Sequence, residues 1–135
     1  MDTIFYQWYK IFPASAEEDY IGIDRIFFAG SNKKTVQYKT DFLSYKTGNA
    51  YIELLSRSDL LTPGWIYTAK AEWLIYFVYP KIIYCLSLKK MRDILSIWKS
   101  KYRTVKVKNT KYFGEGLIVP LQELRAIAKS VLEVK

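Results

Sequence analysis

The sequence of 135 residues lacks histidine and has a single cysteine, Cys85. Without histidine, the chain cannot form a Ser-His-Asp triad, a Cys-His pair, a histidine metal ligand or a histidine proton shuttle. One cysteine cannot form an intramolecular disulfide, and no group of cysteines is present that could hold zinc. Any chemistry must therefore use carboxylates, amides, lysine, tyrosine or a metal ion held by carboxylates.

Long apolar runs are also missing. The most apolar stretch, residues 73–88, is interrupted by Pro80 and Lys81, and each part is too short to span a bilayer. The N-terminal residues lack the basic segment that begins a secretory signal. These absences predict a soluble protein of the cytoplasm or another intracellular compartment, with no membrane partner.

The charge is distributed unevenly along the chain, which has a net charge of +8. Residues 1–60 hold 7 basic and 8 acidic side chains, whereas residues 61–135 hold 14 basic and 5 acidic ones. This asymmetry favours an acidic cluster in the first part and a surface for a polyanion in the second. The alternative is a basic face that only keeps the protein soluble.

Length and hydrophobic periodicity predict one α/β domain over residues 1–135, with a central mixed sheet flanked by helices. The expected helices cover residues 3–12, residues 88–98 with Ser87 as N-cap, and the segment after Pro120 that buries Leu121, Leu124, Ala128 and Val131. The expected strands cover residues 20–28, 35–40, 50–55, 73–78 and 82–86. A basic segment of strand and loops follows over residues 99–111.

Three polar residues of the first two strands form the most informative pattern. Gln37 and Lys39 alternate with Tyr38 and so project from one face of their strand, while Asp24 lies on the partner strand. A carboxylate and an amide oxygen on one patch can hold Mg²⁺ together with water and leave room for a phosphate. The lysine would orient or deprotonate the attacking water, or neutralise charge that develops on the phosphate. An ordinary hairpin with an Asp24–Lys39 salt bridge is the alternative.

The spacing of Asp24 and Gln37-Tyr38-Lys39 resembles the PD-(D/E)XK nuclease superfamily, in the glutamine variant found in Mrr-type restriction enzymes. The small size and the opening helix and three strands also resemble archaeal Holliday junction resolvases. The resemblance covers roughly residues 1–90. It implies a restriction-endonuclease-like fold, Asp24 and Gln37 as metal ligands and Lys39 as the catalytic lysine. It also implies an endonuclease that cleaves DNA with Mg²⁺, or with Mn²⁺ in its place, and that forms a homodimer.

Gln37 carries no charge, so the resemblance leaves room for a further metal-binding carboxylate. The candidates are the acidic run Glu17-Glu18-Asp19, then Asp41 and Glu53, and Glu18 is preferred among them. The sequence also departs from the superfamily because Ile23, rather than proline, precedes Asp24.

A basic stretch with interleaved aromatic residues is the expected nucleic-acid-binding surface. Lysine and arginine neutralise phosphates, and aromatic rings can stack on unpaired bases. Its basic members are Lys99, Lys101, Arg103, Lys106, Lys108 and Lys111. Lysines that only protect an edge strand from pairing are the alternative. Two other functions remain open: an inactive nucleic-acid-binding module on the same fold, and a protein-interaction or assembly factor.

Overall fold

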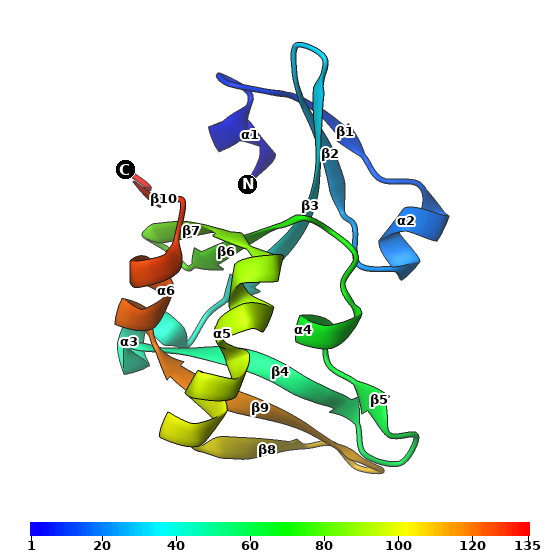
Figure 1. The fold of residues 1–135 in the computed structure, drawn as a ribbon, viewed down its shortest axis with the longest axis vertical. Helices are drawn as coiled ribbons and strands as arrows, with labels where there is room; N and C mark the ends of the chain where they lie inside the picture. The colour runs from blue at the N-terminus through cyan, green and yellow to red at the C-terminus, as the bar shows by residue number, and fades with distance from the viewer.

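The computed structural model describes residues 1–135, which form two β-sheets with helices packed between and beside them (Figure 1). The helices are α1 (Asp2–Phe5), α2 (Ala16–Tyr20), α3 (Ser44–Thr47), α4 (Trp65–Thr68), α5 (Leu88–Lys101) and α6 (Leu121–Ile127). The strands are β1 (Lys10–Pro13), β2 (Arg25–Ala29), β3 (Asn32–Asp41), β4 (Asn49–Arg57), β5 (Thr62–Pro63), β6 (Trp73–Val78), β7 (Ile82–Ser87), β8 (Thr104–Lys108), β9 (Phe113–Pro120) and β10 (Ser130–Glu133). None of the helices is long and apolar enough to cross a membrane.

The first sheet has six strands in the order β1-β2-β3-β6-β7-β10. All neighbours are antiparallel except β3 and β6, which run parallel, so the sheet is mixed as predicted. The parallel pair places Gln37 opposite Leu74 and Lys39 opposite Tyr76. Because side chains alternate along a strand, Gln37 and Lys39 share the face of the sheet on which these two buried residues lie.

The second sheet has four antiparallel strands in the order β5-β4-β9-β8. The prediction of one central sheet was therefore wrong for residues 50–55, which form a strand of this second sheet. Their partner is β9, in which Val119 pairs with Ala50 and Leu117 with Ile52. All four of these side chains are buried, so the pairing builds one continuous apolar face against the molecule's core.

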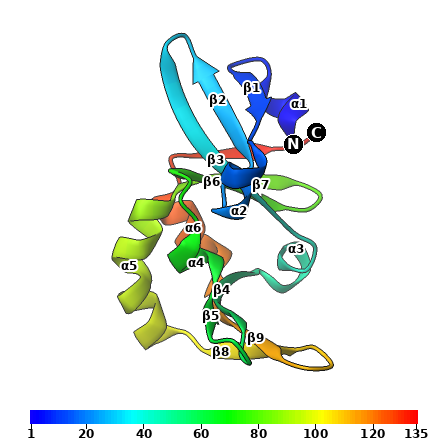
Figure 2. The same ribbon diagram turned by 90° about the vertical axis from the view of Figure 1, so that its right-hand side faces the viewer.

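The main core lies between the two sheets and includes the inner face of α5. The predicted helical spacing is confirmed, because Leu88, Met91, Leu95 and Trp98 are all buried. Ser87 is the N-cap, and its hydroxyl accepts a hydrogen bond from the backbone N–H of Lys90. Figures 1 and 2 show α5 running past both sheets, so one amphipathic helix joins them.

Both predicted hairpins, β2–β3 and β6–β7, are present, but the chain ends differ from the prediction. The predicted helix over residues 3–12 is limited to α1, and the chain then becomes β1, which pairs with β2. The predicted strand over residues 20–28 begins only at Arg25, because residues 16–20 form α2. The last helix ends at Ile127, so Val131 lies in β10, and of its predicted apolar face only Leu124 is fully buried.

Candidate functional site

Asp24 stands directly before β2 and continues the pairing of the β2–β3 hairpin. Its backbone N–H donates to the Val36 carbonyl at 2.8 Å, and Val36 is also the register partner of Arg25, so Asp24 and Arg25 both lie opposite Val36. The backbone N–H of Tyr38 donates to Asp24 Oδ2 at 2.7 Å. One carboxylate oxygen is thus held by β3, and the carboxyl group of Asp24 also lies within hydrogen-bonding reach of the Asp19 carboxyl.

A Schellman turn at the end of α2 leads the chain from Asp19 back to Asp24. The N–H of Gly22 donates to the Asp19 carbonyl at 3.0 Å, and the N–H of Ile23 donates to the Glu18 carbonyl at 2.9 Å. Gly22 occupies the left-handed region with φ of 83°, which glycine adopts without steric cost. The turn therefore sets the last residues of α2 beside the beginning of β2.

Gln37 is 6% exposed, and its amide oxygen Oε1 is buried without a hydrogen-bond partner. Buried polar atoms in proteins nearly always have a partner, and an unpaired one costs about 1–3 kcal/mol. The surrounding backbone is close, since a Cβ added at Gly22 would lie 3.4 Å from Gln37 Nε2 and 2.8 Å from Ala69 Cα. The side chain of Gln37 is thus closely surrounded, and its amide oxygen has no hydrogen-bond donor.

Lys39 is half-buried on the same face of β3, with its Nζ 6.0 Å from the centre of the Trp65 ring. It forms no ion pair with Asp24 within 4.0 Å, because the four salt bridges of the chain join other residues. The alternative of a direct Asp24–Lys39 salt bridge is therefore not realised. The ammonium group still acts on Asp24 through space and favours its ionised form.

Burial and a neighbouring acid raise the pKa of Asp24 above its usual value. Desolvation is the largest cause, and the adjacent carboxyl of Asp19 raises the pKa further. The Tyr38 N–H and Lys39 act in the opposite direction without reversing the shift. The partly buried carboxyl of Asp24 therefore lies beside the exposed carboxyl of Asp19, and a cation would relieve their repulsion.

The other carboxylates proposed from the sequence are engaged elsewhere. Glu18 belongs to a capping box, in which its Oε1 accepts from the Ser15 N–H at 3.0 Å. Asp41 accepts from the N–H groups of the following turn and from the Tyr76 hydroxyl. Glu53 accepts from the Trp65 N–H at 3.2 Å. These contacts give all three residues structural roles.

Asp19 is the acidic residue of α2 that lies beside Asp24, although Glu18 was the preferred member of the run. The sequence contains a signal that separates the two. Ser15 followed three residues later by Glu18 is the pattern of a capping box, which predicts that Glu18 turns back to the helix start. No group of three or more His, Cys, Asp or Glu side chains suited to a metal occurs in the chain. A metal site here would need the Gln37 oxygen together with the two aspartates.

The basic stretch is divided between two places. Lys99 and Lys101 end α5, and Lys106 and Lys108 lie on β8, the edge strand of the second sheet. Figures 1 and 2 show β8 at the end of the molecule opposite the β2–β3 hairpin. Lys99 is linked to α4, because it donates to the Tyr67 hydroxyl at 3.4 Å. The expected nucleic-acid surface is therefore not continuous with the Asp24 corner within one chain.

Several of these basic residues contact protein groups. Lys101 Nζ is 3.7 Å from Glu123, and Lys106 Nζ is 4.6 Å from the centre of the Phe113 ring. Arg103 and Lys111 are exposed in the segments that flank β8. The predicted strand is present, but its apolar face is only partly covered, because Val107 is 56% exposed.

Comparison with known proteins gives no relative. No protein-family model, curated protein or solved structure matches the chain. The functional interpretation of Asp19, Asp24, Gln37 and Lys39 therefore rests on their own geometry. We call these four residues the acidic corner.

Proposed function

We propose that the chain is a Mg²⁺-dependent DNA endonuclease with a restriction-endonuclease-like fold of the PD-(D/E)XK type. The observation that carries this proposal is the buried Oε1 of Gln37, which lacks a donor and lies on the same sheet face as Lys39. A bound cation would supply the partner that this amide oxygen lacks. The mixed sheet and its flanking helices agree with the coarse architecture of that superfamily.

The acidic corner has the donor chemistry that Mg²⁺ requires. Mg²⁺ prefers hard oxygen ligands, is commonly held by one or two carboxylates, and keeps several of its waters. Asp19, Asp24 Oδ1 and Gln37 Oε1 would supply the protein oxygens, and Mn²⁺ could use the same set. When bound, such an ion polarises a phosphate oxygen and acidifies a water molecule. The raised pKa of Asp24 shows that its ionised form is unfavourable beside Asp19. A bound cation would stabilise both carboxylates in their ionised forms.

Lys39 would act on the phosphate group. Its ammonium lies on the same sheet face as Gln37, is half-buried and has no carboxylate partner within 4.0 Å. A partly desolvated positive charge stabilises negative charge that develops on a phosphate during hydrolysis. Tyr38 supports this arrangement from the backbone, since its N–H fixes the orientation of the Asp24 carboxylate.

DNA would be held by basic residues outside the acidic corner. Lys106 and Lys108 on β8 are exposed and project towards solvent, as phosphate contacts require. Since β8 is remote from the β2–β3 hairpin, a homodimer would give a duplex access to a basic strand and an acidic corner of different copies. A two-fold assembly would also suit the cutting of both strands.

A plasmid-nicking assay with Mg²⁺ or Mn²⁺ tests the proposal. Asp24→Asn and Lys39→Met should each abolish nicking, whereas Asp93→Asn, which alters an exposed carboxylate on α5, should leave it unchanged. Metal-dependent thermal stabilisation of the folded chain gives a second readout that does not depend on turnover. Nicking that survives both substitutions in the acidic corner would reject the assigned roles.

A non-catalytic nucleic-acid-binding module is the second candidate. The observation that favours it is the neutral Gln37, which leaves the acidic corner with two carboxylates instead of three. Such a module would bind DNA with the steep salt dependence of phosphate contacts and would not cleave it with either metal. The same assay, combined with a binding titration, separates the two functions.

A further inference from the structure

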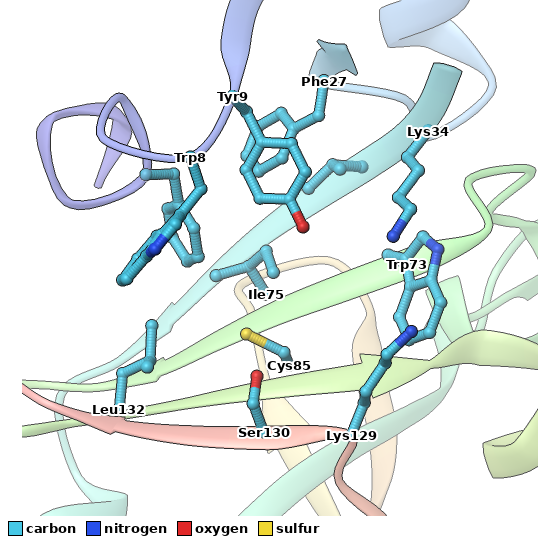
Figure 3. A pocket seen from close by; sticks show the side chains of 12 residues that line it. Trp8, Tyr9, Phe27, Lys34, Trp73, Ile75, Cys85, Lys129, Ser130 and Leu132 are labelled. Carbon is cyan, nitrogen blue, oxygen red and sulfur yellow. The ribbon is translucent and has the colours of Figure 1, made fainter. Parts of the chain in front are cut away.

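A cavity of about 400 Å³ opens on the other face of the six-stranded sheet (Figure 3). Its floor includes Val36 on β3 and Ile75 on β6, which alternate with Gln37 and Leu74 and so point away from the acidic corner. The cavity is thus separated from the acidic corner by the sheet itself. Pockets that hold small molecules in proteins commonly have volumes of about 300–1,000 Å³.

Five of the twelve residues that line the cavity are aromatic. Figure 3 shows Trp8, Tyr9 and Phe27 on one side of the space and Trp73 on another. Tyr9 and Phe27 are packed together with their ring centres 5.1 Å apart, so each ring restricts the position of the other. Flat conjugated rings stack favourably on such surfaces, whereas a flexible alkyl chain gains no comparable stacking.

Two lysines converge on the rim of the cavity without an acidic partner. Lys34 Nζ and Lys129 Nζ lie 5.4 Å and 5.2 Å from the centre of the Trp73 ring. Neither forms a salt bridge, and none of the lining residues is acidic. Two ammonium groups beside an aromatic wall are electrostatically complementary to an anion that has an apolar body.

We propose that this cavity binds an aromatic anion, in which a planar ring system carries a sulfonate, carboxylate or phosphate. The ring would lie among Trp8, Tyr9 and Trp73, and the anionic group would lie between Lys34 and Lys129. Ser130, whose hydroxyl points into the cavity in Figure 3, offers a hydrogen-bond partner to a polar ring substituent. Free aromatic acids and the base and phosphate of a nucleotide share this chemistry. The inference does not depend on the proposed nuclease function.

Two fluorescent probes of nearly the same shape separate charge recognition from apolar burial. 8-Anilinonaphthalene-1-sulfonate carries one negative charge, and N-phenyl-1-naphthylamine has the same rings without the sulfonate. The full chain should bind the sulfonate more tightly. The double substitution Lys34→Met and Lys129→Met, which keeps an apolar stem at each position, should weaken sulfonate binding by about tenfold or more. Binding of the neutral probe should remain unchanged.

Matched controls keep the test independent of stability. Lys33→Met and Lys90→Met remove two exposed charges outside the cavity and should leave sulfonate binding as it is. Cys85, the single cysteine and a lining residue, reports occupancy, because bound sulfonate should slow its reaction with a thiol reagent. Ile75→Phe should fill the floor and reduce the binding of both probes.

Further arms identify the source of the anion. Competition of the sulfonate by adenosine 5′-monophosphate would indicate a free nucleotide, and competition only by a 5′-phosphorylated oligonucleotide would indicate a strand end. Competition only by naphthalene-2-carboxylate would indicate a non-nucleotide acid. Equal binding of both probes that the lysine substitutions do not alter would overturn the proposal. So would absence of probe binding, or self-association that buries Cys85 and is insensitive to the probes.

Discussion

Gln37 combines burial, an unpaired oxygen and a position next to Tyr38, whose N–H holds the Asp24 carboxylate. Its neutrality has an electrostatic consequence, because a third carboxylate in this corner would add to the repulsion between Asp19 and Asp24. An amide therefore lowers the cost of the metal-free state and weakens attraction for a divalent ion. Glutamine at position 37 therefore favours stability of the metal-free fold, whereas glutamate would favour metal affinity.

Gln37→Glu should reduce the stability of the metal-free protein and increase its affinity for metal. The substitution should lower the melting temperature without metal and increase the stabilisation that Mg²⁺ provides, because ligand binding to the native state adds to stability. Thermal unfolding with and without Mg²⁺ measures both effects. Gln122→Glu on α6 is the matched control, since that side chain is exposed and outside the acidic corner. A response to Mg²⁺ identical to that of the original chain would exclude position 37 from the metal site.

Asp24→Asn should stabilise the metal-free protein at neutral pH. Because the pKa of Asp24 is raised in the folded state, the native chain binds a proton more readily than the unfolded chain. The ionised Asp24 therefore costs stability above its folded pKa, and this cost disappears as the pH falls below the unfolded value of about 3.9. Asparagine keeps an oxygen that can accept from the Tyr38 N–H.

Melting temperatures of both proteins between pH 3 and pH 8 test whether Asp24→Asn is stabilising. The asparagine variant should exceed the original chain at pH 7 and match it at the acidic end, while losing the stabilisation by Mg²⁺. Asp93→Asn should show no such gain, because Asp93 is exposed and pairs with Lys89 at 3.0 Å. A destabilised Asp24→Asn variant across the whole pH range would mean that the carboxylate is needed for the fold and not strained by burial.

At the scale of elements, the connection from α2 to β2 positions the acidic corner. The Schellman turn needs a residue with positive φ, and Gly22 also lies against Ala69 at the end of α4. The same glycine therefore satisfies a backbone requirement and a packing requirement. Both act on the segment that brings Asp24 to the Tyr38 N–H of β3.

Gly22→Ala should destabilise the fold more than Gly30→Ala. Both glycines have positive φ, where a non-glycine residue costs about 1–2 kcal/mol. A Cβ at Gly22 would also lie 2.8 Å from the Ala69 Cα, whereas one at Gly30 would have no atom within 4 Å. Relieving that overlap should add about 1–3 kcal/mol to the loss. Urea unfolding of the two variants gives the comparison, and equal losses would mean that the α4 contact is readily displaced.

The elements that sequence patterns located were those held by local interactions. Short turns connect the strands of the β2–β3 and β6–β7 hairpins. The sequence of α5 contains both the apolar spacing of its buried face and the Ser87 cap. The partner of β4 is β9, about sixty residues further along the chain, and periodicity alone does not indicate which distant strands pair. The choice between Glu18 and Asp19 depended on the phase of α2, which its capping box determines.

At the scale of the whole molecule, the two sheets separate different surfaces. Gln37 and Lys39 of the acidic corner lie on the inner face of the first sheet, the aromatic cavity lies on its outer face, and the basic strand β8 lies at the far edge of the second sheet. The sequence indicated the charge asymmetry between its two parts, but the folded chain determines where each charge is displayed. A polyanion that contacts β8 is therefore bound at a distance from the acidic corner of the same copy.

Lys106→Met with Lys108→Met should weaken DNA binding and reduce its dependence on salt. Each phosphate contact contributes about 0.9 to the slope of log affinity against log salt on duplex DNA, so losing two should lower the slope by about 2. Fluorescence anisotropy of a labelled duplex at several KCl concentrations measures this change. Lys46→Met with Lys90→Met is the charge-matched control, because both residues are exposed on other elements. If both double variants lose affinity equally, the attraction to DNA is due to the net charge of the protein. The lysines of β8 would then only protect an edge strand from pairing.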